Sequence, residues 1–489
     1  MAFEHHGARK WAALWRSLEM QFAFDRDRPF GWRRKSEQKD GENGQWMLVR
    51  TSRDFKNQET PMLFMDATGD ENILRRFVPD LTKVTRIEIE LLNVSVTQIT
   101  DIAFSKGGFA PGDPKKTLPA EFTRQNNNAT ALGHFTEIVA HGRDAGLITY
   151  KATEQALEEA LPGTIKTGHF NDTRGRNFWE NVDVLVMAGR PLPSENEVEF
   201  LAESIFWNSD VEITKAKYAE TRSAYLSRDH VTPTTRIVHP DPLVESVRYQ
   251  ICEGELLQNF ARPRPIRRTA EKPVEIYILT NVPIPIPVDQ LTTWKEMKPT
   301  NKFAVAEARG VLLENAVDMA AAYPDLFANG QAARNAKRAE RSVQIPYKDS
   351  LIGKLHTPLA TARYQLPGAG QKPKTAFFDP QQIPDIRAWL TGYLGELRLC
   401  EVGSPRVAVA ATDDLAEWQS GTMPRSIVAA VVRVQRSCAI SQEELAQHCG
   451  VSRPHLANVL QGRFGLAKAA AAKVKAFLAD PPVVQPNLI

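Results

Sequence analysis

A group of arginines after position 257 has the residue types and the spacing that chemistry on phosphate groups requires. Gln258 is followed four residues later by Arg262 and then by Arg264, at the end of a helical pattern. A guanidinium group stays charged and grips phosphate oxygens in pairs, so a fixed arginine stabilises the charge that develops during phosphoryl transfer. A basic helix end that only neutralises its own dipole is the alternative interpretation.

A second group of polar residues lies between the apolar stretches 146–150 and 182–187. It is rich in hydrogen-bond donors, which are His169, Asn171, Arg174, Arg176 and Asn177. A polar turn that contains glycine, placed between two strands, presents such donors at strand ends, where they suit contacts with phosphate. An ordinary loop with solvated charge is the alternative.

A third group, Asp66 and Thr68, follows the apolar stretch 61–65, which predicts a strand. A short acid and a hydroxyl at a strand end can exchange hydrogen bonds between neighbouring parts of a protein. A strand that ends in a simple Asp/Thr cap is an alternative. A further alternative is a Mg²⁺-binding carboxylate at Asp66, which the neighbouring Ala67 disfavours because a glutamate is expected there.

The segment 440–478 predicts short helices joined by a tight turn. Ser441 and Glu444 have capping-box spacing, and Gly450 suits the left-handed backbone of a turn. Ser452 is expected to cap the next helix, with Pro454 in its first turn.

These groups are spread over an alternation of strands and helices. Strands are predicted at 61–65, 84–100, 146–150, 182–187 and 274–279, and helices at 128–144, 153–160, 197–206 and 241–260. Such alternation predicts an α/β domain with a parallel sheet in three layers over 61–300. We expect a helical N-terminal segment over 1–60, an α-rich accessory region over 301–424, an all-α domain over 425–480 and a tail over 481–489.

Composition and charge narrow the class of protein. The 489 residues are 42% hydrophobic and 24% charged, which excludes a wholly disordered chain. No run of 18 apolar residues and no apolar signal region occurs, and the four cysteines form no C-x-x-C pair, so we expect a cytoplasmic protein without a membrane span or metal site. Residues 425–480 hold eight Lys or Arg and three Asp or Glu, a net charge of +5. Another basic cluster, comprising Arg334, Lys337, Arg338 and Arg341, is equally compatible with a solvated face.

The three polar groups, in their order along 61–77, 146–202 and 245–269, resemble the second RecA-like lobe of superfamily 2 helicases, a P-loop NTPase fold. The resemblance extends to helicase-like proteins of plasmids and integrated mobile elements. It implies that Asp66 and Thr68 couple nucleotide state to nucleic-acid binding, and that the donors at 169–177 contact phosphates. It also implies that Gln258, Arg262 and Arg264 form motif VI, whose arginines reach the γ-phosphate of ATP. The family's second arginine falls where this chain has Pro265, so Arg264 and Arg267 are both candidates.

The C-terminal segment resembles the helix-turn-helix of phage repressors of the Cro/C1 type. This resemblance implies that Arg453, His455 and Asn458 read DNA bases, while Gln442 and Ser452 contact phosphate. A helical hairpin used for docking is the alternative.

ATP hydrolysis additionally requires a phosphate-binding loop and an acidic pair, and the sequence contains neither. No G-x-x-x-x-G-K-[ST] motif occurs, and no Asp-Glu pair ends an apolar strand. In helicases both elements precede the position of Asp66, where about 60 residues are too few for a first lobe. We therefore expect no ATP hydrolysis and no cofactor for the chain alone, with ATP and Mg²⁺ bound only where a partner supplies the Walker A lobe.

The sequence is compatible with two functions and with a third possibility, a chain without activity. The chain is expected to be a helicase-related, DNA-binding component of a DNA-processing system, with residues 1–60 as a remnant of the first lobe. The alternative is a helix-turn-helix regulator or plasmid-maintenance protein that keeps a RecA-like scaffold without catalysis. A decayed fragment without activity is the third.

Overall fold

The computed structural model describes most of the chain from residue 61 onward. The described ranges are 61–342, 360–403, 418–432, 441–460 and 464–479, without residues 62, 67, 79, 86, 88, 208–210, 228–229, 369–371, 425–426 and 429–430. Of residues 1–60, it gives only the backbone of β1 (Trp32–Lys35) and β2 (Gln45–Leu48), which pair antiparallel. The helical segment expected near the N-terminus, Ala67 and the tail 481–489 lie outside the described residues.

The chain divides into two compact units. The first consists of Met1–Gly133 and Arg143–Lys298, and the second of His134–Gly142 and Pro299–Ile489. The change of unit after Lys298 lies next to the boundary expected at residue 300. Residues 301–424 and 425–480, expected as separate domains, belong to one unit but have separate hydrophobic cores.

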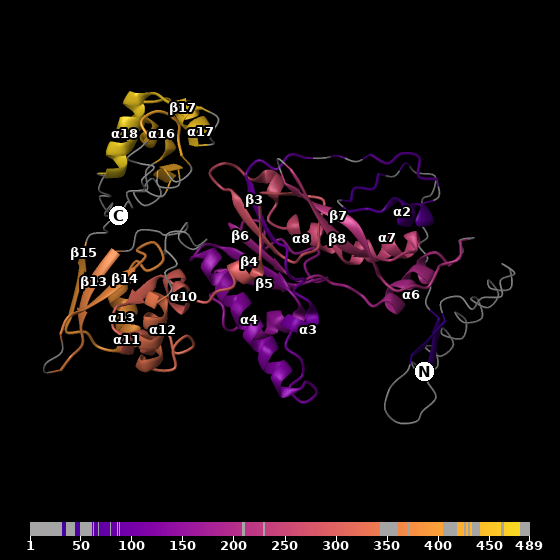
Figure 1. Cartoon of the computed structure of the whole chain (residues 1–489), viewed down its shortest axis with the longest axis horizontal. Coiled ribbons are helices and arrows are strands. Elements are labelled where there is room, and N and C mark those ends of the chain that lie inside the picture. The colour runs from indigo at the N-terminus through magenta and orange to yellow at the C-terminus, as the bar shows by residue number, and fades with distance from the viewer. Residues whose placement is uncertain are drawn as a thin grey trace, which may run out of the picture. The chain divides into compact units, whose positions relative to one another are not determined.

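The first unit is built on a six-stranded sheet in which every pair of neighbouring strands is parallel (Figure 1). Its order is β11-β3-β9-β6-β4-β5. The strands are β3 (Val94–Ile99), β4 (Ala145–Thr149), β5 (Ile165–His169), β6 (Val184–Ala188), β9 (Val274–Leu279) and β11 (Gln290–Thr292). The predicted parallel α/β fold is therefore confirmed, and this sheet is compatible with a RecA-like domain.

Helices connect the strands and cover both faces of the sheet. They are α2 (Glu71–Phe77), α3 (Lys106–Phe109), α4 (Pro119–Ala140), α5 (Lys151–Leu157), α6 (Glu195–Ile205), α7 (Pro242–Ile251), α8 (Glu253–Phe260) and α9 (Trp294–Met297), with a 3-10 turn η1 (Pro265–Arg267). The connections β3–β4 and β4–β5 advance across the sheet in one direction, and β5–β6 and β6–β9 return. Because such crossovers are right-handed, α4 and α5 lie on one face, and the loop 170–183 lies with α8 on the other (Figure 1).

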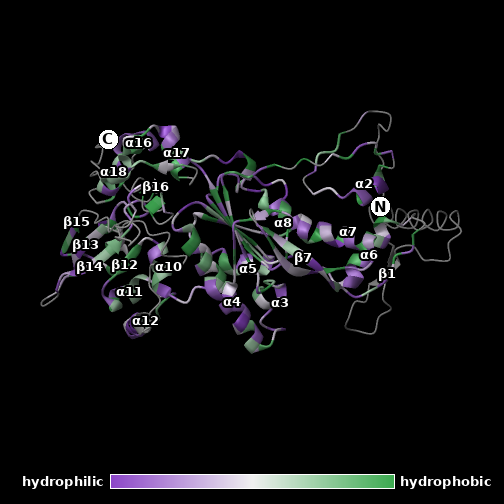
Figure 2. Cartoon of the chain, turned by 45° about the horizontal axis from the view of Figure 1, so that its top comes forward, coloured by the Kyte–Doolittle hydropathy of each residue, from purple (hydrophilic) through white to green (hydrophobic). Residues whose placement is uncertain are grey.

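The core of this unit explains why the strands are apolar throughout. Both faces of a parallel sheet are buried, so every residue of β4 and β6 is buried. The helices beside the sheet, such as α4 and α7, show both hydrophilic and hydrophobic residues in Figure 2. Trp179, 1% exposed, anchors the loop 170–183 to the sheet and donates from Nε1 to the Lys166 carbonyl at 3.1 Å. Gly168 makes room for it, because a Cβ there would lie 2.3 Å from the indole ring. The loop is thereby fixed beside α8.

Several predicted elements differ from those observed. The described residues of 61–65 form no strand, and Leu63 and Met65 are exposed. The strand predicted over 84–100 begins only at Val94, since no described strand pairs with residues before it. The helix predicted over 241–260 is broken at Cys252, whose φ and ψ of −99° and −80° are not helical.

Several strands of the first unit had no sequence prediction. Among them are β5 and β11 of the large sheet, and three strands that form a small sheet in the order β10-β7-β8, in which β7 (Ala219–Ser227) and β8 (Val231–Val238) form an antiparallel hairpin. Strand β10 (Pro287–Val288) pairs parallel with β7. The hairpin strands carry no clear sequence signal, because their residues are half-buried or exposed except for Tyr225 and they lack the apolar run of a buried strand.

The second unit contains an antiparallel sheet in the order β12-β14-β13-β15, so the expectation of an α-rich region over 301–424 needs correction. Its strands are β12 (Val311–Leu313), β13 (Ala360–Gln365), β14 (Lys374–Phe378) and β15 (Leu399–Gly403). Its helices are α10 (Lys302–Ala308), α11 (Ala316–Ala322), α12 (Gly330–Ser342) and α13 (Ile386–Leu394). These strands are short and mix apolar with polar residues, so sequence patterns do not distinguish them from the helical patterns around them.

The C-terminal part of the second unit has its own small core. It contains α16 (Gln442–Cys449), α17 (Arg453–Leu460), α18 (Lys468–Ala479) and a two-stranded pairing of β16 (Gly421–Thr422) with β17 (Gly465–Leu466). Leu445, Leu456 and Val459 are fully buried in this core. The predicted capping box of Ser441 with Glu444 and the left-handed Gly450, at φ 70°, are confirmed.

Candidate functional site

The three polar groups singled out in the sequence meet along one short helix, α8, and the turn that follows it. Segment 66–77 contacts α8 and its neighbour α7, and the loop 170–183 runs beside α8. Gln258 lies on α8, and Arg262 and Arg264 lie directly after it. Positions almost 200 residues apart in sequence are therefore neighbours in the first unit.

Thr68 is the point at which the first group reaches α7 and α8. Gln258 Nε2 donates to Thr68 Oγ1 at 3.0 Å, and Gln250 Nε2 donates to the Thr68 carbonyl at 2.6 Å. Asp66 Oδ1 accepts from the Thr68 amide at 2.7 Å and from its hydroxyl at 3.1 Å. The threonine is thus held on its backbone and side chain by residues of three segments.

The residues after Thr68 are fixed by a helix cap and by packing. Asp70 caps α2 by accepting from the Ile73 amide at 3.1 Å. Asn72 donates to Ser246 of α7 at 3.3 Å, and Ile73 packs against the buried apolar cluster of α6 and α7. Segment 66–77 is therefore docked, although residues before it are exposed.

A series of contacts ties the loop 170–183 to α8. Glu255, which is 1% exposed, accepts from the Asn171 amide at 2.7 Å and from Asn259 at 3.2 Å. Thr173 donates to Asn259 at 2.6 Å. The loop is thereby aligned with α8 over the helix's full length, which places its donors beside the arginines.

Arg174, Arg262 and Arg264, referred to below as the arginine cluster, lie close enough to influence one another. Burial lowers the pKa of Arg262, and the positive charges of Arg264 and Arg174 lower it further, against the opposing influence of Glu255. Arg174 Nη2 lies 3.4 Å from Glu255, and Arg264 Nη2 donates to Asn177 Oδ1 at 3.3 Å. Like charges collected around one carboxylate leave an excess of positive charge that suits an anion.

The chain is rigid where it presents this cluster. Arg264 has a left-handed φ of 52° and stands between Pro263 and Pro265, whose rings restrict the backbone. The Nε atoms of Arg262 and Arg264 are buried and have no hydrogen-bond partner among the residues that the structure describes. Unpaired guanidinium atoms held on a strained turn are typical of a ligand site.

Arg264, and not Arg267, belongs to this cluster. Arg267 is largely exposed and forms an ion pair with Glu180 at 3.0 Å. Arg268 has a structural role, since it donates to the carbonyls of Pro263, Glu180 and Val182. Of the two candidates for the second arginine, the geometry therefore favours Arg264.

Two of the predicted donors form a separate group. His169 is hydrogen-bonded through Nδ1 to Glu154 of α5, and Arg176 forms an ion pair with Asp172 at 2.6 Å. Both are already matched by carboxylates, so they add less free positive charge than the arginine cluster does.

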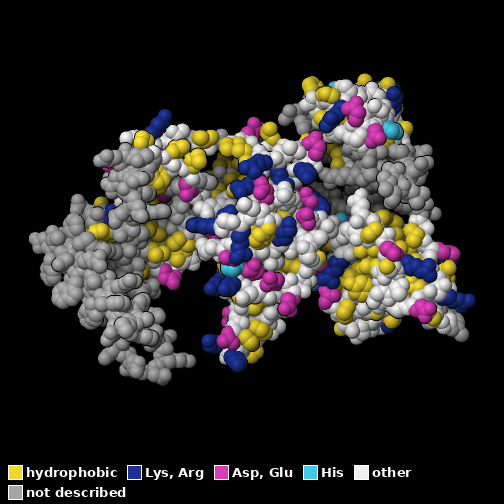
Figure 3. Space-filling model, turned by 180° about the vertical axis from the view of Figure 1, so that it is seen from behind, with side chains coloured by type: hydrophobic (Ala, Val, Ile, Leu, Met, Phe, Trp, Pro, Cys, Tyr) yellow, Lys and Arg dark blue, Asp and Glu magenta, His cyan; other side chains and the backbone are white. Residues whose placement is uncertain are grey.

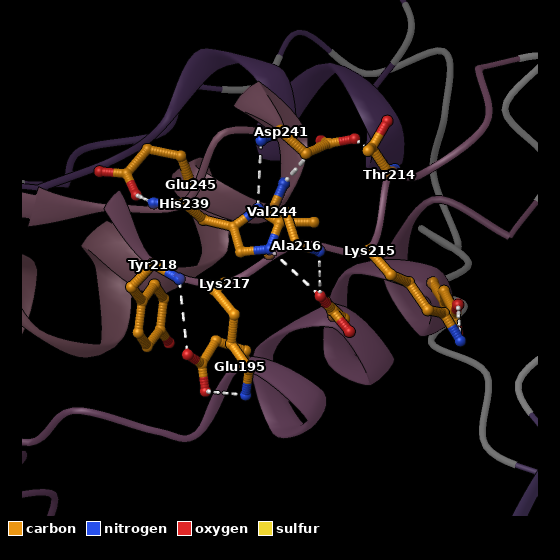
Figure 4. A network of polar contacts seen from close by, with 12 residues as sticks. Glu195, Thr214, Lys215, Ala216, Lys217, Tyr218, His239, Asp241, Val244 and Glu245 are labelled. Atoms are coloured by element: carbon orange, nitrogen blue, oxygen red, sulfur yellow. Dashed lines mark hydrogen bonds and ion pairs between the residues drawn. The ribbon is translucent and has the colours of Figure 1, made fainter. Parts of the chain in front are cut away.

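A buried polar network that the sequence did not reveal positions α7 (Figure 4). The Asp241 amide donates to His239 Nδ1 at 3.1 Å, which leaves the proton on Nε2, facing Glu199 at 3.2 Å. Asp241 caps α7 by accepting from the Val244 amide and also accepts from the Thr214 amide. No local sequence motif predicts this network, because its members come from three separate segments.

Arg248 closes the junction of α7 and α8. It is fully buried and hydrogen-bonds to Glu245 and Glu253 at 2.7 and 2.8 Å. Burial disfavours its charge, but the bonds to these two carboxylates outweigh that effect and raise its pKa. This pairing fixes the angle at which Gln250 and Gln258 converge on Thr68.

The predicted DNA-reading residues lie on α16 and α17 of the second unit. Arg453 and Ser452 are exposed, whereas Gln442, His455 and Asn458 are half-buried. Asn458 Nδ2 donates to the Pro454 carbonyl at 3.0 Å within its own helix, and the His455 ring stacks on Phe464. Arg453, at the first position of α17, is thus the most accessible of the predicted base-reading side chains.

In the described part of the first unit, the arginine cluster collects positive charge that suits an anion. Figure 3 shows Lys and Arg side chains gathered on one face of the first unit, with Asp and Glu among them. Among the described residues, no group of three or more His, Cys, Asp or Glu is placed to hold a metal ion. None of the helices in the described part of the chain is long and apolar enough to cross a membrane.

Comparison with known proteins finds no matching family model and no significant match among curated proteins or solved structures.

Proposed function

We propose that this chain is a helicase-related, DNA-binding component that supplies a second RecA-like lobe and a helix-turn-helix module. The observation that carries the proposal is the convergence on α8 of Thr68, Gln258 and the arginine cluster. The Thr68 hydroxyl links two segments, and the arginines after α8 keep guanidinium atoms without a described partner. Half of a nucleotide cleft needs this arrangement.

The other half of such a cleft must contain a phosphate-binding loop and an acidic pair. The printed sequence contains neither, so ATP and Mg²⁺ enter this proposal only with a Walker A lobe supplied from outside it. Arg262 then plays the part of the finger that stabilises the transferred phosphoryl group, with Arg264 beside it.

The test is ATP hydrolysis by the full chain mixed with a polypeptide, encoded in a neighbouring reading frame, that carries a Walker A loop. We expect DNA-stimulated hydrolysis that neither polypeptide shows alone. Arg262→Ala should lower kcat by about 10³-fold with little change in KM. Arg267→Ala is the matched control, because that arginine is exposed and paired with Glu180, and it should stay within about twofold. No hydrolysis above the sum of the two polypeptides would refute the proposal.

A second function is favoured by the packing of α16, α17 and α18. The capping box, the left-handed Gly450 and the accessible Arg453 suit a helix-turn-helix that acts as a regulator or in plasmid maintenance. In that case Arg453→Ala abolishes the cellular function, whereas Arg262→Ala leaves it unchanged. A plasmid-retention assay with both variants separates the two functions.

A further inference from the structure

Helix α12 belongs to the second unit, where Figure 1 labels it near α11 and α13. Its apolar and its basic residues lie on different sides of the helix. Ala333 is fully buried and Ala336 packs against the core of the antiparallel sheet. At about 100° per residue, Arg334 and Arg338 fall on one flank of that buried stripe, and Lys337 lies between the stripe and Arg334. The opposite flank carries Ala332. The side chain of Arg341 lies outside the described part of the chain. The cations are therefore gathered on one side instead of being spread around the helix.

Arg334, Lys337 and Arg338 form no ion pair with any residue whose side chain the structure describes. The sequence of the helix contains one acidic residue, Glu340. A solvated helix face ordinarily mixes acids and bases at spacings of three and four residues. The absence of such pairing leaves a positive flank.

A neutral side chain orients the first of these arginines. Gln331 Oε1 accepts from Arg334 Nε at 3.1 Å and from Nη2 at 3.0 Å, and Gln331 itself donates to Asn335 at 2.9 Å. A carboxylate in the place of Gln331 would hold the guanidinium equally well but cancel its charge. The amide fixes the group and leaves the charge and the Nη1 donors available.

Lys337 is also held, since its Nζ lies 3.4 Å from the Glu314 carbonyl. A backbone carbonyl, like the Gln331 amide, restricts the side chain without neutralising it. Two of the three described cations are therefore restrained by neutral acceptors, which lowers the entropy lost when they bind an anion.

We propose that the basic flank of α12 is a binding face for the phosphodiester backbone of duplex DNA. Two of its three described cations are arginines, which grip phosphate oxygens in pairs. A membrane surface fits less well, because the accessible neighbours Gln331 and Asn335 are polar and the apolar side of the helix is used in the core. The face offers charge and no base-reading geometry, so its binding is independent of sequence.

The experiment measures binding of the full chain to a labelled duplex of arbitrary sequence by fluorescence anisotropy at several salt concentrations. In Arg334→Gln/Arg338→Gln, the slope of log affinity against log salt should fall by about 1.8, since each lost phosphate contact removes about 0.9. At about 0.1 M salt this corresponds to a loss of one to two orders of magnitude in affinity. The control is Arg363→Gln/Arg387→Gln, which removes two exposed arginines elsewhere in the unit and should leave the slope unchanged.

A second variant tests the role of the neutral acceptor. Gln331→Glu keeps an oxygen beside Arg334 but adds a negative charge, and we expect it to weaken binding by about tenfold. An unchanged slope in the double variant, or equal effects in the control, would overturn the proposal. So would loss of binding to phosphatidylserine vesicles, or to an acidic protein, while DNA binding stays intact.

This proposal does not depend on the nucleotide cleft. If the α12 variants weaken DNA binding while no partner yields ATP hydrolysis, the basic face stands and the helicase-related function fails. If the α12 variants bind DNA normally while a partner does yield ATP hydrolysis, only the proposal for the α12 face is refuted.

Discussion

At the scale of single residues, the bond between Thr68 and Gln258 joins segments 190 positions apart in the sequence. Gln250 also donates to the Thr68 carbonyl, so both helices are hydrogen-bonded to the turn that Asp66 closes. The Thr68 hydroxyl donates to Asp66 and accepts from Gln258 at the same time, so it links the turn directly to α8.

A double-mutant cycle on Thr68→Val and Gln258→Leu measures this link. Each single change should cost about 1 kcal/mol, and the double variant should cost little more than either one because both remove the same bond. Hydrogen exchange of the α2 amides reports the effect as about fivefold faster local opening. Thr68→Ser keeps the hydroxyl and should behave like the unmodified chain; full additivity would argue against the coupling.

His134 on α4 provides a prediction about pH. Burial lowers its pKa below the ordinary 6.5, and the positive Arg309 and Lys302 act in the same direction against Asp325. The unfolded chain therefore takes up a proton at a higher pH than the folded chain, so stability falls as pH drops through about 6.5.

In His134→Gln this component should be absent. The thermal midpoint should therefore fall less between pH 7.5 and pH 5.5 in the variant than in the unmodified chain. Burial raises the pKa of the neighbouring Glu137 despite its bond to Arg309. This raised pKa makes stability rise as pH falls, opposite to the effect of His134. The pH dependence of the variant is therefore compared with that of the unmodified chain. Identical pH dependence in both would contradict the assignment.

At the scale of elements, the break between α7 and α8 brings the polar groups together. A continuous helix over 241–260, as the periodicity predicts, would separate Gln250 from Gln258 by two turns on one rod. The buried Arg248 with Glu245 and Glu253 instead stabilises a bend at Cys252. Periodicity shows which residues face the core, but it does not reveal a bend held by ion pairs.

The cap of α16 gives a prediction at this scale. Ser441→Ala removes the acceptor for the Glu444 amide and should cost about 1 kcal/mol. Amides of 442–449 should then exchange about fivefold faster, with the parallel sheet unaffected. Glu443→Gln alters an acid in the same first turn that accepts no capping bond, and it should change exchange less than twofold.

Sequence patterns predicted elements whose signal is local. The apolar strands β4, β6 and β9, the capping box at Ser441 and the turn at Gly450 follow from neighbouring residues, and all were predicted. The strand at 61–65 was wrong because an apolar run identifies a strand only when a partner is available to it. The bonds to Glu255, and the network around His239, depend on residues brought together by the fold and carry no local signal.

At the scale of the whole molecule, three described features each concentrate positive charge. The arginine cluster lies in the first unit, and α12 and the C-terminal helices lie in the second. The overall net charge is only +3, so acidic residues elsewhere offset these surfaces. A polyanion is thus attracted to particular faces and not to the molecule as a whole.

We expect the C-terminal helices to make DNA binding selective for sequence, and α12 to add affinity for any duplex. Arg453→Ala should reduce binding to a duplex obtained by in vitro selection by about 10- to 100-fold, with a smaller effect on an unrelated duplex. The α12 double variant should weaken both duplexes equally. Equal weakening of both by Arg453→Ala would mean that this arginine contacts phosphate alone.

The left-handed turn at Arg264 has a consequence for how the chain tolerates change. Only glycine adopts φ 52° without steric cost, yet the position holds a long cationic side chain between two prolines. Relieving the strain with glycine would make the turn easier to form while deleting a charge from the cluster. Under the proposed function, thermal stability and anion binding therefore place opposite demands on this one position.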